Sequence, residues 1–127
     1  MKIVVLLGTI LLGFQFALHS QAKETHGPDC SGGWPANMTF VHLKNAGLVD
    51  NDSIDFSKTK TARLASEQIG KDLWHQVYYI EFTKKSGDTI DAIAIHDAST
   101  EECSMTGVEV FLISRHLGEK MIFAQQN

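Results

Sequence analysis

The sequence predicts an α+β fold, in which one N-terminal helix packs on a four-stranded antiparallel β-meander and one disulfide closes the domain. Three observations predict this fold. One helical segment comes first along the chain, segments with strand alternation follow it, and the two cysteines lie far apart.

The helix is expected over residues 35–46. Pro35 suits a first helical turn, because the N–H that proline lacks has no partner at that position in any helix. Gly47 is available for a left-handed cap that ends the helix. Asp, Asn, Asp and Ser at 50–53 then form a turn.

Four strands are expected after this turn, over residues 58–66, 73–84, 89–96 and 108–116. The second has the clearest alternation, and one of its faces is rich in large apolar residues that should pack on the helix. That face carries Trp74, Gln76, Tyr78, Ile80 and Phe82. Residues 85–88 are typical of a hairpin turn, and the apolar residues on both faces of 89–96 indicate a central strand.

The N-terminus predicts export. Lys2 precedes an almost purely apolar run over 3–18, and Ser20 and Ala22 place small residues where a signal peptidase requires them. The run is shorter than the roughly 20 residues that span a bilayer. We therefore expect a cleaved signal peptide over 1–22, a flexible lead-in over 23–33, a single domain over 34–118 and a tail over 119–127, with no stable membrane insertion after cleavage.

The chain that remains after cleavage is acidic, with 10 basic and 15 acidic residues and a net charge of −5. This balance argues against a nucleic-acid partner, whose phosphates require clustered Lys and Arg. Cys30 and Cys103 should form a disulfide, because exported proteins meet an oxidising environment. In the chain-entropy model a loop of this length gains about 4 kcal/mol of stability.

No motif for catalysis, metal binding or a cofactor is expected. Ser104 lacks a Gly-x-Ser-x-Gly elbow, and adjacent carboxylates such as Glu101 and Glu102 point apart on an extended segment. The histidines beyond the signal peptide lie in different elements without zinc-like spacing. They are His26, His42, His75, His96 and His116. The chain is therefore expected not to be an enzyme and to need no cofactor.

Two N-x-S/T sequons begin at Asn37 and Asn51. They would accept glycans only in a eukaryotic secretory pathway. The short n-region with one lysine is typical of a bacterial signal peptide, which indicates a periplasmic or secreted protein.

The connection over 97–107 is much longer than a hairpin needs, and long connections often carry function. Cys103 would tether it, and His96 at its entrance would make a contact there sensitive to pH. The candidate partner-binding residues are Asp97, Ser99, Thr100, Glu101, Glu102 and Ser104.

In architecture the chain resembles the small periplasmic immunity proteins and lysozyme inhibitors of Gram-negative bacteria. Some of these inhibitors carry Tyr-x-x-x-Thr-Lys-Gly, and residues 79–85 match this motif except that Lys85 replaces the glycine. The companion Ser-Gly-x-x-Tyr should come earlier in the chain, whereas Ser86 and Gly87 follow the first motif and Ile90 replaces the tyrosine.

Two functions from different classes remain open. One is an inhibitor or immunity protein whose tethered acidic loop enters the cleft of an exported hydrolase or toxin. The other is a small-ligand-binding or structural module of the cell envelope, in which the concave face of the sheet holds an apolar ligand against the helix.

Overall fold

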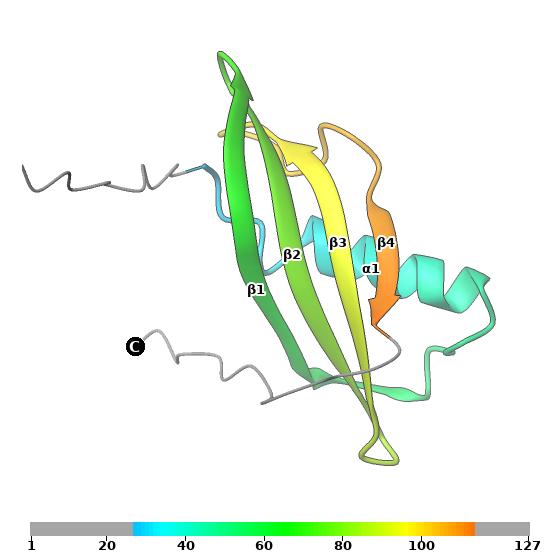
Figure 1. Ribbon diagram of the computed structural model, residues 1–127. Coiled ribbons are helices and arrows are strands. Elements are labelled where there is room, and N and C mark those ends of the chain that lie inside the picture. The colour runs from blue at the N-terminus through cyan, green and yellow to red at the C-terminus, as the bar shows by residue number, and fades with distance from the viewer. Residues whose placement is uncertain (1–26, 114–127) are drawn as a thin grey trace, which may run out of the picture.

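A computed structural model describes residues 27–113 of the chain and confirms the predicted fold class. One helix lies across a four-stranded antiparallel sheet whose strands follow sequence order (Figure 1). The elements are α1 (Trp34–Asn45), β1 (Ile54–Gly70), β2 (Leu73–Lys84), β3 (Thr89–Ala98) and β4 (Glu109–Ile113). The predictions for the signal peptide, for residues 23–26 and for residues after 113 lie outside the described residues.

Helix α1 has its predicted proline in the first turn and ends as the sequence indicates. Gly47 adopts a left-handed conformation with φ 73°. Its N–H donates to Lys44 O, and the N–H of Leu48 donates to Leu43 O, which together form a Schellman cap. Pro35, Thr39 and Leu43 form the buried stripe of the helix. The buried Thr39 hydroxyl donates a hydrogen bond to Pro35 O, one turn earlier in the helix, at 2.7 Å.

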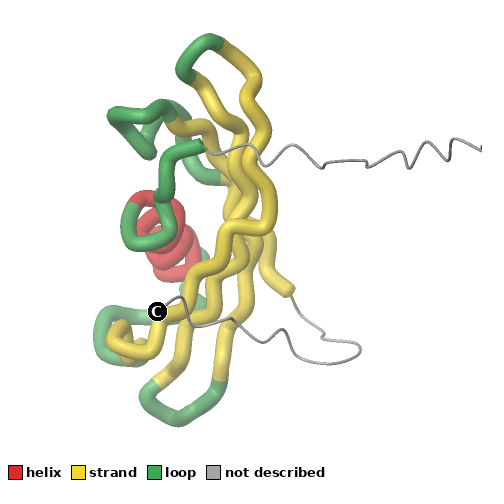
Figure 2. Tube along the Cα trace, turned by 90° about the vertical axis from the view of Figure 1, so that its left-hand side faces the viewer, coloured by secondary structure: helices red, strands yellow, loops and turns green. Residues whose placement is uncertain are grey.

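The core lies between α1 and the sheet (Figure 2). Tyr78, Ile80 and Phe82 of β2 face the helix as predicted and are almost fully buried. Beside them, Ala94 and Ala98 of β3 are fully buried. Because alanine is small, it lets a helix approach the sheet closely.

Trp74 differs from the prediction that it faces the helix. A Cβ placed on Gly27 would come within 2.7 Å of the indole, so the ring packs on the lead-in to the helix instead. Alternation places a residue on one face of a sheet but does not say which segment covers it.

The strands also differ in length from the prediction. Strand β1 runs over 17 residues rather than 58–66, and its pairing with β2 shifts register between Asp55 and Lys60, between Arg63 and Ala65, and between Gln68 and Gly70. Such shifts interrupt the period-2 pattern by which a strand is found. Strand β3 continues to Ala98, two residues beyond its expected end, and this shortens the connection to β4.

We expect Phe82→Ala to lower the free energy of unfolding by about 3–5 kcal/mol, because the ring is 1% exposed and its loss leaves a cavity. Urea unfolding measures this. Phe111→Ala is the matched control, because Phe111 is 52% exposed and should cost less than about 1 kcal/mol. Equal losses in the two variants would contradict the assignment of the core.

Candidate functional site: the disulfide-anchored loop

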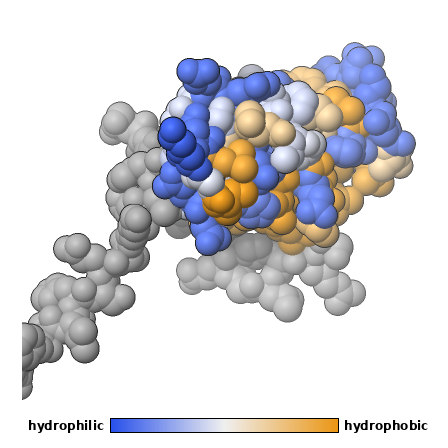
Figure 3. Space-filling model, turned by 90° about the horizontal axis from the view of Figure 1, so that it is seen from above, coloured by the Kyte–Doolittle hydropathy of each residue, from blue (hydrophilic) through white to orange (hydrophobic). Residues whose placement is uncertain are grey.

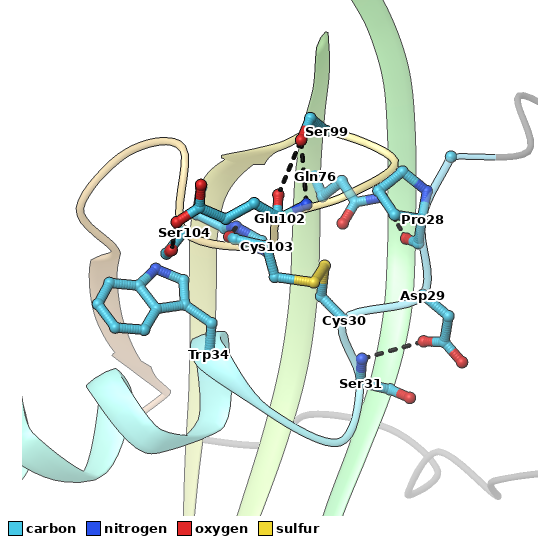
Figure 4. The surroundings of a disulfide bond; sticks show 12 residues. Pro28, Asp29, Cys30, Ser31, Trp34, Gln76, Ser99, Glu102, Cys103 and Ser104 are labelled. Atoms are coloured by element: carbon cyan, nitrogen blue, oxygen red, sulfur yellow. Dashed lines mark hydrogen bonds between the residues drawn. A yellow bond between two sulfur atoms is a disulfide. The ribbon is translucent and has the colours of Figure 1, made fainter. Parts of the chain in front are cut away.

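The disulfide predicted from the sequence is present between Cys30 and Cys103, with a Cα–Cα distance of 5.8 Å. It joins the segment that precedes α1 to the connection between β3 and β4 (Figure 4). Cys30 is 2% exposed, so the bridge is part of the core. Bonds of this kind form and persist in oxidising compartments, which agrees with export.

The described part of the lead-in is held to the sheet by hydrogen bonds from β2. The Tyr78 hydroxyl accepts from the N–H of Cys30 at 3.0 Å and donates to Gln76 Oε1 at 3.1 Å. Gln76 Nε2 in turn donates to Pro28 O at 2.8 Å. Burial raises the pKa of Tyr78, so the hydroxyl keeps the proton that it donates. These bonds fix one end of the disulfide on the central part of the sheet.

The other end of the disulfide lies in the connection between β3 and β4, which three further bonds restrain. His96 Nδ1 donates to Cys103 O at 2.8 Å. The N–H of Asp97 donates to Thr106 Oγ1 at 2.8 Å, and Trp34 Nε1 donates to Thr106 O at 3.2 Å. The connection is therefore tied to β3 and to the start of α1. We call residues 99–107 the anchored loop.

The anchored loop also contacts the turn between β1 and β2. Both the N–H and the hydroxyl of Thr100 donate to Asp72 Oδ1, at 3.1 and 2.9 Å. Next to this contact, the N–H of Glu102 donates to Ser99 Oγ at 3.0 Å and the N–H of Ser99 donates to Glu102 O at 2.8 Å, which closes a tight turn. Two connections that are distant in sequence thus form one end of the molecule.

The structure brings most of the predicted partner-binding residues together. Thr100, Glu101 and Glu102 are exposed, and the Ser104 hydroxyl donates to Glu102 Oε1. Ser99 is 8% exposed, so it supports the turn and offers little surface to a partner. Asp97 belongs to β3 rather than to the loop, and its carboxylate accepts from His75 Nδ1 at 2.6 Å.

Residues that the sequence analysis did not single out complete this end. Asp72 holds Thr100, and the apolar side chains of Ile69 and Met105 are 51% and 47% exposed. Figure 3 looks onto this end and shows hydrophobic side chains among hydrophilic ones. The topology could have indicated Asp72. In an antiparallel meander the first and third connections lie at the same end of the sheet, so the turn that contains Asp72 is expected near the loop.

His96, which the sequence places at the entrance of this connection, is 2% exposed and therefore offers no surface to a partner. Its ring stacks on Tyr78 with centroids 5.6 Å apart. Its Nε2 is buried and has no hydrogen-bond partner in the described chain. Burial lowers the pKa of His96, although hydrogen bonds to Asp97 O and Cys103 O act in the opposite direction. Because His96 is buried, its protonation would affect a partner only by changing the position of the loop to which it bonds.

A second polar cluster lies on the face of the sheet away from the helix. Lys60 Nζ donates to Glu81 Oε1 at 2.8 Å, and Glu81 is 1% exposed. Burial and the neighbouring Asp91 raise the pKa of Tyr79 to about 12. The ion pair and the neutral phenol both suit a structural role on this face.

Within residues 27–113 there is no group of three or more His, Cys, Asp or Glu side chains placed to hold a metal ion. The helix described in the same range is too short and too polar to cross a membrane. Comparison with protein-family models, with curated proteins and with solved structures finds no match. A functional hypothesis must therefore come from the chemistry and geometry of the surface.

Replacing both cysteines by alanine should lower the free energy of unfolding by about 4 kcal/mol, because the unfolded chain regains the freedom of a long loop. Urea unfolding of the double variant measures this. Wild-type protein in reductant should lose a similar amount, and alkylation before and after reduction reports the state of the thiols. Two thiols that alkylate freely in protein isolated from an oxidising compartment would contradict the bridge.

Protonation of His96 should destabilise the fold. Because the folded pKa lies below the ordinary value of about 6.5, the unfolded chain binds more protons, and stability falls as the pH drops below that value. Over about pH 8 to pH 5, His96→Asn should lose less stability than wild type, since an amide can still donate to Cys103 O but does not titrate. His42→Asn, on the exposed side of α1, should follow wild type. Parallel profiles for all three proteins would contradict this assignment.

Proposed function

We propose that this protein is an exported protein-binding module, an inhibitor or immunity protein that neutralises a secreted hydrolase or toxin in the periplasm or outside the cell. The observation that carries the proposal is the multiple anchoring of an exposed acidic loop. The disulfide, the bonds to Thr106 and the contact between Thr100 and Asp72 hold the loop before any partner arrives.

Anchoring matters because a binding loop normally loses conformational entropy when a partner orders it. A loop that is already ordered avoids most of that loss, so more of the contact energy appears as affinity. The same fixed frame also presents its side chains in one register. Rigid loops at one end of a small domain are suited to enter the cleft of an enzyme.

The chemistry of this end fits such a contact. Ile69 and Met105 supply exposed apolar surface, which fully desolvated interface centres require. Glu101 and Glu102 supply negative charge at the same end, and both are exposed. Carboxylates at the rim speed encounter with a basic partner and fix its orientation. The partner that suits this end is a protein with a concave, basic groove, as a peptidoglycan-cleaving enzyme would have.

Reversing the charge of the loop tests the proposal. Wild-type protein should lower the rate at which an extract of exported proteins degrades purified peptidoglycan, and should protect cells that express it. The Glu101→Lys/Glu102→Lys variant should lose at least about 90% of both effects, because like charges would now meet the basic groove.

The control carries the same charge change at the opposite end of the molecule. Asp52→Lys/Asp88→Lys alters two exposed residues in the connection from α1 to β1 and in the turn between β2 and β3. It should inhibit as well as wild type does. Inhibition that survives the loop swap unchanged would show that the loop is not the interface. If wild-type protein leaves the rate of peptidoglycan degradation by the extract unchanged, a peptidoglycan hydrolase is not the partner.

A further inference from the structure

An open groove of about 500 Å³ lies between α1 and β1, apart from the anchored loop. Its apolar wall consists of three aromatic rings from three elements. Phe40 of α1 meets Phe56 of β1 edge to face, with centroids 4.9 Å apart, and lies 6.3 Å from Phe82 of β2. Phe56 is 51% exposed, so this wall is open to solvent. The volume lies within the range of ligand pockets, roughly 300–1,000 Å³.

The rest of the groove carries hydroxyl and amide groups. Ser31, Asn37, Thr59 and Thr61 line it. The Thr59 hydroxyl oxygen is inaccessible to water and has no hydrogen-bond partner in the described chain. An unpaired buried hydroxyl destabilises a fold, so a ligand that bonds to it after a change of the Thr59 χ1 rotamer would recover that loss.

The lining carries no charged side chain. It consists of Ser31, Gly32, Ala36, Asn37, Phe40, Val41, Phe56, Thr59, Thr61 and Phe82. A charged ligand would lose its hydration here without gaining an opposite charge, which is costly. A purely apolar ligand would leave the polar lining unpaired. The groove therefore suits an uncharged molecule with a flat apolar body and a hydrogen-bonding group at its edge.

We propose that this groove is a binding site for an uncharged small molecule of that class. Its apolar body packs on Phe40 and Phe56, and its polar group bonds to the Thr59 hydroxyl after a change of the Thr59 χ1 rotamer turns that hydroxyl into the groove. The site is independent of the anchored loop, since no residue of the loop lines it. The domain would therefore bind a small molecule in this groove whether or not the loop binds a protein.

N-phenyl-1-naphthylamine is a suitable probe, because it is uncharged, has a flat aromatic body with one N–H, and fluoresces strongly when it leaves water. Full-length wild-type protein should bind it saturably at one site. Val41→Trp, at the exposed rim of the groove, should weaken binding at least about tenfold by covering the opening. Ala46→Trp places the same side chain at an exposed position outside the groove and should leave binding unchanged.

Thr59→Val tests the polar contact. It keeps the shape of the side chain and removes the hydroxyl, so it should weaken binding about fivefold, as the loss of one hydrogen bond does. Without ligand the variant should unfold no more easily than wild type, because the hydroxyl has no partner to lose in the described chain.

Three results would overturn the proposal. The first is fluorescence that does not saturate, or that is equal in the Val41→Trp and Ala46→Trp variants. The second is tighter binding of the anionic analogue 8-anilinonaphthalene-1-sulfonate than of the neutral probe. The third is a dimer in sedimentation analysis that Val41→Trp dissolves and Ala46→Trp does not, because a second copy would then be what covers the groove.

Discussion

The Cys30–Cys103 bridge is the constraint on which the arrangement of this molecule depends. It joins the lead-in to α1 with the anchored loop, at a point where the hydroxyl of Tyr78 also holds the backbone of Cys30. The helix needs this support. Its fully buried stripe contains only Pro35, Thr39 and Leu43, and the other apolar residues that it packs against the core are partly exposed, namely Trp34, Ala36, Met38 and Phe40. The disulfide and the hydrogen bond to Tyr78, just before the helix, add to the packing that holds the helix on the sheet.

The same disulfide also restrains the anchored loop, because Cys103 belongs to that loop. His96 of β3 donates to Cys103 O, and the N–H of Asp97 donates to the Thr106 hydroxyl. Trp34 donates to Thr106 O and so connects the loop to the helix. The meander topology then adds the turn of Asp72, which is remote in sequence from the loop but adjacent in space. This surface consists of the connection between β1 and β2 and the connection between β3 and β4, and the disulfide holds the second of them. Its shape therefore depends on the whole fold rather than on local sequence.

The sequence predicted those features whose signal is local. The bounds of β2 follow from the alternation of large apolar residues, and the disulfide follows from two cysteines in a chain whose N-terminus predicts export. The extent of β1 did not follow, because three register shifts interrupt its period. The burial of His96 and the contact of Trp74 with Gly27 also depend on segments brought together only by folding. The groove was equally out of reach, since it is a space left between side chains of three elements.

Strand β1 has one further consequence, for behaviour at high protein concentration. It is a long edge strand, and in the described part of the chain it pairs only with β2. An open edge of this length is a template on which other chains can add strands and aggregate. Here the register shifts break the row of free backbone groups. A second copy that approached this edge would meet an irregular ladder, so the irregularity that makes β1 hard to find in the sequence also disfavours edge-to-edge pairing of the folded protein.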